Sequence, residues 1–121
     1  MHPVNLGLRF LLELAALAAL AIWGRAQAFG PAGLLCMIGA PGIVVAVWST
    51  FTVPGDPSRG DGGLVAVPGW LRLLLELTVF TLSAVALYDL GRADLAAALA
   101  AATLMHYGLS YRRLHWLLRG P

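Results

Sequence analysis

Residues 33–53 read GLLCMIGAPGIVVAVWSTFTV and contain no charged side chain. The charge-free stretch around them runs for 30 positions, from the residue after Arg25 to the residue before Asp56. A helix needs about 20 mostly apolar residues to cross roughly 30 Å of hydrocarbon. This stretch therefore predicts a transmembrane helix, and it indicates an integral membrane protein.

The composition of the whole chain agrees with this interpretation. Of its 121 residues, 60% are hydrophobic and 12% are charged, whereas soluble domains average about 25% charged residues. A soluble globular domain is excluded because its surface would be short of charge. The single cysteine, Cys36, cannot close a bridge within the chain, which excludes a disulfide scaffold, and the apolar fraction excludes a disordered chain.

Four segments are predicted to cross the membrane, and together they form a single all-α domain over residues 1–121. Each segment must be a helix because backbone groups find no water partners in lipid. The short links between segments predict antiparallel neighbours. The predicted fold is a four-helix transmembrane bundle with a loop at 54–69. The predicted helices are about 6–23, 33–53, 70–90 and 95–111.

The arginines determine the predicted orientation, since the chain contains no lysine. The opposite side carries only Arg25 and Arg92. By the positive-inside rule, both termini and the loop 54–69 are predicted to be cytoplasmic, in a bacterial cytoplasmic membrane. The rule also explains the net charge of +2 without nucleic acid as a partner. The arginines on the predicted cytoplasmic side are Arg9, Arg59, Arg72, Arg112, Arg113 and Arg119.

The N-terminus also imitates a signal peptide. Arg9 supplies the basic region, an apolar run follows it, and Ala26-Gln27-Ala28 supplies a small-residue cleavage site. Glu13 at the head of the apolar run disfavours this interpretation, and cleavage would leave three crossings instead of a paired set. We therefore expect the first segment to be a membrane helix.

A seven-residue element occurs twice in the chain. Residues 8–14, LRFLLEL, recur as residues 71–77, LRLLLEL, and each copy opens a helix that enters the membrane from the cytoplasm. Because the two helices run in the same direction, the repeat predicts two hairpins related by a pseudo-twofold axis along the membrane normal.

Several segments are shared with a known family. They are 5–14, NLGLRFLLEL, the loop 53–59, VPGDPSR, the second Arg/Glu element at 72–76, and 107–111, YGLSY. With these segments the chain resembles the YrdB-like family of small bacterial membrane proteins over nearly its whole length. The resemblance implies the membrane topology. It implies no chemistry, because the function of that family is unknown.

Charged residues inside the predicted helices are candidates for function. Glu13 and Glu76 each lie six or seven residues into a helix, roughly 10 Å below the cytoplasmic surface at about 1.5 Å per residue. Arg9 and Arg72 precede them by four residues on the same helical faces, close enough to pair within a helix or across to the other copy. Intramembrane carboxylates usually pair with another group or serve a ligand, so these elements predict a functional or structural layer.

The other two predicted helices bring polar side chains to the same layer. The outer halves of all four are almost entirely apolar, which predicts a pocket open to the cytoplasmic leaflet and argues against a polar path across the membrane. The candidate catalytic residues are Glu13, Glu76 and His106. The candidate ligand-binding residues are Arg9, Arg72, Trp48, Tyr107, Ser110, Tyr111 and Arg112.

Two hypotheses from different classes follow. In the first, the pocket binds a small lipophilic molecule and transforms it by acid/base chemistry of the epoxide or isoprenoid type, with one glutamate neutral in apolar surroundings and the other ionised beside arginine. In the second, the layer is structural, with salt bridges such as Arg9–Glu76 and Arg72–Glu13, and the chain is an accessory protein, half of a homodimer or the partner of another membrane protein. Proton-coupled export of a small molecule is a third and weaker alternative.

Other features of the sequence indicate simpler roles. Metal-ligand spacings, phosphate loops and nucleophile elbows are missing from the sequence, so we expect no metal or nucleotide cofactor.

For His106, a hydrogen bond within the bundle is the alternative to catalysis. Membrane lipid is an expected partner, because the arginines near the C-terminus attract anionic head groups. The tryptophans expected to anchor helix ends are Trp23, Trp48, Trp70 and Trp116.

Overall fold

The computed structural model describes residues 3–53 and 65–119, which form five helices and two short strands. The all-helical fold class predicted from the sequence is confirmed. The helices are α1 (Pro3–Ala26), α2 (Gly30–Thr50), α3 (Gly69–Asp89), α4 (Ala93–Leu109) and α5 (Tyr111–Arg119). The strands are β1 (Phe51–Thr52) and β2 (Val65–Ala66), which pair in parallel.

Three of the helices have the length and composition of membrane spans. These are α1, α2 and α3, whereas α4 is apolar but shorter, with 17 residues. The chain therefore has the character of a membrane protein. The crossing of the membrane by α4, and with it the four-helix transmembrane bundle, stays a prediction.

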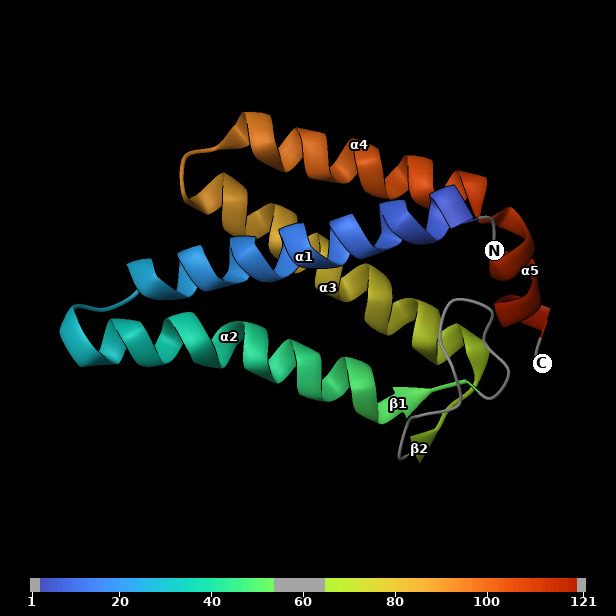
Figure 1. Cartoon of the computed structure of the whole chain (residues 1–121), viewed down its shortest axis with the longest axis horizontal. Helices are drawn as coiled ribbons and strands as arrows, with labels where there is room; N and C mark the ends of the chain where they lie inside the picture. The colour runs from blue at the N-terminus through green and yellow to red at the C-terminus, as the bar shows by residue number, and fades with distance from the viewer. Residues whose placement is uncertain (1–2, 54–64, 120–121) are drawn as a thin grey trace.

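The long helices form two hairpins, α1–α2 and α3–α4, with α1 packed against α3 (Figure 1). The turns within the two hairpins lie at one end of the structure. The start of α1, the strands and α5 lie at the opposite end. This second end is the one that the arginine distribution predicts to be cytoplasmic.

Glycines with positive φ make both hairpin turns short. Gly30, with a φ of 61°, comes just before Pro31 in the first turn of α2, where the missing N–H of proline costs no helical hydrogen bond. Gly91, with a φ of 80°, follows α3, and its N–H donates to the carbonyl of Tyr88 at 3.0 Å. Each hairpin is therefore antiparallel, as the short links predicted.

The second helix differs from its predicted bounds of 33–53. It begins at Gly30 and ends at Thr50, and the next two residues form β1. The charge-free residues 49–53 do not mark this end, which depends on contacts with α3 described below. Of the predicted loop 54–69, residues 54–64 lie outside the described residues, and Gly69 already begins α3.

The fourth helix also ends earlier than its predicted limit of 111. The backbone leaves the helical conformation at Ser110, whose N–H donates to the carbonyls of His106 and Tyr107. A new helix, α5, then begins at Tyr111. This helix was not predicted from the sequence, and it determines which C-terminal side chains enter the site.

The apolar core lies between the two hairpins. The Phe80 ring meets the Trp48 ring edge-on at 5.8 Å and the Tyr107 ring at 6.3 Å, so α2, α3 and α4 are joined by aromatic contacts. The core residues are Leu12, Ala16, Trp48, Phe80, Leu99 and Tyr107.

Two glycines allow helices to touch backbone to backbone. A Cβ atom at Gly24 in α1 would collide with the carbonyl of Cys36 in α2, and a Cβ atom at Gly69 in α3 would collide with that of Leu117 in α5. The second contact places α5 against the start of α3, next to the charged residues of that helix.

Candidate functional site

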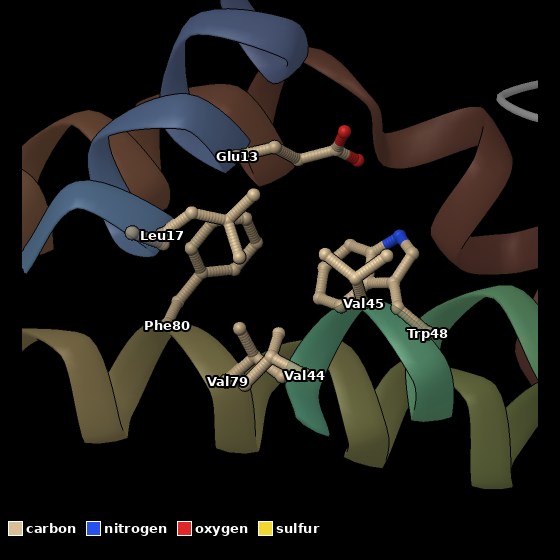
Figure 2. Close-up of a pocket in the computed structure, with 8 residues that line it drawn as sticks. Glu13, Leu17, Val44, Val45, Trp48, Val79 and Phe80 are labelled. Carbon is tan, nitrogen blue, oxygen red and sulfur yellow. The ribbon is translucent and has the colours of Figure 1, made fainter. Parts of the chain in front are cut away.

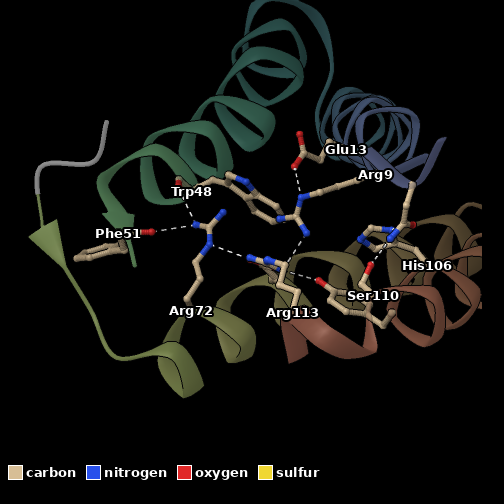
Figure 3. A network of polar contacts seen from close by, with 11 residues as sticks. Arg9, Glu13, Trp48, Phe51, Arg72, His106, Ser110 and Arg113 are labelled. Carbon is tan, nitrogen blue, oxygen red and sulfur yellow. Dashed lines mark hydrogen bonds and ion pairs between the residues drawn. The ribbon is translucent and has the colours of Figure 1, made fainter. Parts of the chain in front are cut away.

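Glu76 of α3 is completely buried, and both oxygens of its carboxylate accept hydrogen bonds. Its Oε1 accepts from Arg9 Nη1 at 3.2 Å, Tyr107 OH at 2.7 Å and Arg113 Nη1 at 2.9 Å. Its Oε2 accepts from Arg72 Nε at 2.9 Å and Arg113 Nη2 at 2.7 Å. These five residues, which we call the Glu76 cluster, bring α1, α3, α4 and α5 together at one carboxylate. Figure 3 shows the side chains of Arg9, Arg72 and Arg113 pointing toward one another from α1, α3 and α5.

Arg72 also connects α2 to the Glu76 cluster. Its Nη1 donates to the carbonyl oxygens of Trp48 at 2.8 Å and Phe51 at 2.9 Å. Carbonyls in the last turn of a helix lack partners within the helix, so this arginine stabilises the end of α2. The guanidinium also lies 4.7 Å from the centre of the Trp48 ring. Through Arg72 all five helices contact the cluster.

Glu13 occupies the same position in the first sequence copy that Glu76 occupies in the second, but its surroundings differ. Its Oε1 lies 3.2 Å from Arg9 Nε, and its side chain is 27% exposed, compared with 0% for Glu76. The environments of the two glutamates are therefore not equivalent.

Glu13 lies at a small pocket between α1, α2 and α3, with a volume of about 50 Å³ (Figure 2). We call this the Glu13 pocket. Apart from the carboxylate and the indole nitrogen of Trp48, its side chains are apolar. The residues that line it are Glu13, Ala16, Leu17, Val44, Val45, Trp48, Val79 and Phe80.

Of the two salt bridges predicted between the copies, the Arg9–Glu76 pair is present at 3.2 Å. The prediction of an Arg72–Glu13 pair was wrong: Arg72 pairs with Glu76, and Glu13 with Arg9, each within its own helix at a spacing of four residues. The reason is that Glu76 lies between the helices, within reach of several arginines, whereas Glu13 faces the pocket.

His106 is completely buried and belongs to a separate polar group with Asn5 and Ser110. Its Nδ1 lies 2.8 Å from the Asn5 carbonyl oxygen, and the Asn5 amide nitrogen donates to the Ser110 hydroxyl. Because the Asn5 oxygen can only accept, His106 Nδ1 carries the proton. Among the described residues, His106 Nε2 has no hydrogen-bond partner. The group attaches the start of α1 to the end of α4.

Two of the predicted ligand-binding residues lie outside these polar groups. Tyr111 and Arg112 are exposed, and they contact each other, with the guanidinium 5.9 Å from the ring. The break at Ser110 explains their position, since α5 turns Arg113 and Leu117 inward instead.

Arg113 and Asn5 belong to the site but were not predicted from the sequence. Arg113 was expected at the lipid head groups, yet it supplies two donors to Glu76. Apolar residues at positions 114, 117 and 118 have the spacing of an amphipathic helix, which was an available signal for α5. Asn5 precedes Arg9 and Glu13 at intervals of four residues, so a polar stripe along α1 was the signal for its place in the site.

Comparison with known proteins identifies the family. The family described as "Protein of unknown function (DUF2568)" matches residues 7–104, a range that includes Arg9, Glu13, Arg72 and Glu76. The chain belongs to this family. It is 36% identical over 118 residues to "Uncharacterized protein YrdB" of Bacillus subtilis (strain 168), covering 98% of this chain and 96% of that protein. No solved structure matches it.

Family membership confirms the resemblance to YrdB-like proteins noted in the sequence. The matched range ends before α5, so it does not include Arg113. Because the family description and the relative's name state no activity, any function must be argued from the two glutamates and their surroundings.

Proposed function

We propose that this membrane protein binds a small lipophilic molecule in the Glu13 pocket without catalysing a reaction. The observation that carries the proposal is the contrast between the glutamates: Glu13 is partly exposed and lines an otherwise apolar pocket, whereas Glu76 is closed off by arginines. By the predicted orientation, the pocket lies in the cytoplasmic half of the membrane.

The arrangement of Glu76 favours binding over acid/base catalysis. A general acid or base must lie within hydrogen-bond reach of the atom it serves. Glu76 and His106 are completely buried, and neither lines the pocket. Glu13 would therefore act without a second catalytic carboxyl group, and Glu76 is better explained as the residue that holds the pocket walls in place.

The character of the pocket favours a lipophilic ligand. Its walls come from three helices with the length and composition of membrane spans, and six of its eight side chains are aliphatic or phenyl groups. Val45 at the pocket is 48% exposed, so the pocket opens on the outer surface of the helices. A molecule dissolved in the bilayer reaches such an opening sideways.

A quenching experiment tests this proposal. The protein is placed in lipid nanodiscs, and 1-bromodecane is added as an apolar probe whose bromine quenches nearby tryptophan fluorescence. We expect saturable quenching that is lost in Trp48→Phe, because Trp48 forms a wall of the pocket. Quenching that rises without saturation and is unchanged by Trp48→Phe would contradict the proposal.

A matched pair of variants controls for general effects on the surface. Val45→Phe fills the Glu13 pocket, whereas Val85→Phe places the same group in a separate groove between α3 and α4. Both valines are exposed, at 48% and 58%, so both variants are expected to fold. Only Val45→Phe is expected to weaken the saturable quenching, and equal effects of the two would contradict a site at Glu13.

A structural role in a larger assembly is the second candidate function. It is favoured by the Glu76 cluster, which joins all five helices and has the character of a permanent structural element. As an accessory protein, the chain is expected to associate with a second copy or with another membrane protein. Native mass spectrometry from nanodiscs checks this, and a strictly monomeric particle would count against it.

A further inference from the structure

We infer that the Glu13 pocket selects an uncharged hydroxyl headgroup on an apolar chain, held between the indole N–H of Trp48 and the carboxylate of Glu13. The inference rests on the proposed function, because it names the chemical class of molecule that this same pocket takes.

One wall of the pocket carries a hydrogen-bond donor that lacks an acceptor among the described residues. Trp48 is 7% exposed, and its Nε1 is buried without a hydrogen-bond partner among the described residues. Buried donors in proteins are nearly always paired, because an unpaired one has lost its hydrogen bond to water without gaining another. In Figure 2 the indole nitrogen lies on the edge of the Trp48 ring that faces Glu13. A ligand in the Glu13 pocket that supplies an acceptor to this N–H therefore binds more tightly than one that does not.

Glu13 supplies a hydrogen-bond acceptor at the same pocket. An ionised carboxylate accepts hydrogen bonds and donates none. The Glu13 ion pair with Arg9 is made by one oxygen, Oε1, and the side chain is still 27% exposed. A ligand that donates to Glu13 and accepts from Trp48 needs a hydrogen-bond donor and an acceptor in one small group. A hydroxyl provides both the donor and the acceptor.

The surrounding charges disfavour a charged headgroup of either sign. A cation is disfavoured because Glu13, the carboxylate at the pocket, already pairs with the buried guanidinium of Arg9 at 3.2 Å. The Trp48 ring would otherwise attract a cation. It already has two guanidiniums near it: the Cζ atoms of Arg72 and Arg9 lie 4.7 and 5.6 Å from the centre of the ring. An anion is disfavoured because it would meet the carboxylate of Glu13 at the pocket.

The volume of the pocket sets how much of the ligand it encloses. A water molecule needs about 10–15 Å³ of cavity volume, and a cavity of about 150 Å³ admits benzene. At about 50 Å³, the Glu13 pocket has room for a hydroxyl group and the first carbons of a chain. The chain then leaves past Val45 into the lipid, as expected for a long-chain alcohol.

Thermal unfolding in nanodiscs tests the inference with four probes of equal chain length: 1-decanol, decane, decylamine and decanoic acid. A ligand that binds only the folded protein raises its unfolding temperature. We expect 1-decanol to raise it most. Trp48→Phe keeps an aromatic ring without the N–H, and we expect it to weaken 1-decanol binding about tenfold, as the loss of one hydrogen bond predicts. Glu13→Leu is expected to have at least the same effect.

Trp70→Phe is the matched control, because Trp70 is 58% exposed and does not line the pocket. It should leave 1-decanol binding unchanged. A greater effect of decylamine or decanoic acid would overturn the hydroxyl assignment in favour of a cation or anion site. If decane and 1-decanol raise the unfolding temperature equally, and Val45→Phe blocks both effects, the hydroxyl assignment is overturned and the proposed function stays intact. No effect of any probe would overturn both.

Discussion

The guanidinium of Arg113 forms two hydrogen bonds with the carboxylate of Glu76, at 2.9 and 2.7 Å. Paired hydrogen bonds of this kind are among the strongest that side chains form, and their geometry is specific. Since Arg113 belongs to α5 and Glu76 to α3, the pair fixes the C-terminal helix to the bundle.

Replacing Arg113 with methionine is expected to lower the free energy of unfolding by about 2 kcal/mol, because two charge-assisted hydrogen bonds are lost. Arg112→Met is the matched control, since its side chain is exposed, and it should change stability by no more than about 0.5 kcal/mol. Unfolding by SDS in mixed micelles, followed by circular dichroism, measures both. Equal losses would contradict the assigned role of Arg113.

The hydroxyl of Tyr107 is predicted to stabilise the protein through its hydrogen bond to Glu76, at 2.7 Å. Tyr107→Phe removes only this hydroxyl and should cost about 1.5–3 kcal/mol, the range for a hydrogen bond to a charged group. Tyr111→Phe removes a hydroxyl from a side chain that is 62% exposed, and it should have little effect. Comparison of the two unfolding curves checks the prediction, which fails if Tyr111→Phe is the more destabilising.

The contact between α1 and α2 is predicted to tolerate no side chain at Gly24. A Cβ atom there meets the backbone of Cys36, which cannot move aside as a side chain can. Gly24→Ala is therefore expected to cost about 2 kcal/mol through overpacking. In the same helix, Gly7 has open space around it, so Gly7→Ala should be neutral or stabilising by about 0.5 kcal/mol. The opposite order in their unfolding temperatures would show that the helices do not pack this closely.

Much of the fold was predictable because its causes are local in the sequence. Mostly apolar segments of about 20 residues predicted the long helices, and short links predicted the antiparallel hairpins. The Arg/Glu elements predicted that Arg9 and Glu76 meet, because paired charges are the least costly way to bury a carboxylate in a membrane. The helix α5 was missed because its amphipathic pattern extends over only nine residues, and one side of the helix is polar.

The difference between Glu13 and Glu76 was not predictable from the sequence. The two copies of the element differ only at one apolar position, Phe10 against Leu73. What separates the glutamates is the position of other helices: α5 brings Arg113 to Glu76, and α4 brings Tyr107. These contacts join residues 31 and 37 positions apart, so only the packed structure assigns one glutamate to the cluster and the other to the pocket.

The division between a structural Glu76 and an accessible Glu13 is tested most directly by comparing Glu76→Gln with Glu13→Gln in one unfolding experiment. Glu76→Gln leaves three buried guanidiniums without their shared carboxylate and should cost about 3–5 kcal/mol. Glu13→Gln breaks one partly exposed ion pair and should cost about 1 kcal/mol or less. Equal losses, or a larger loss for Glu13→Gln, would contradict the division.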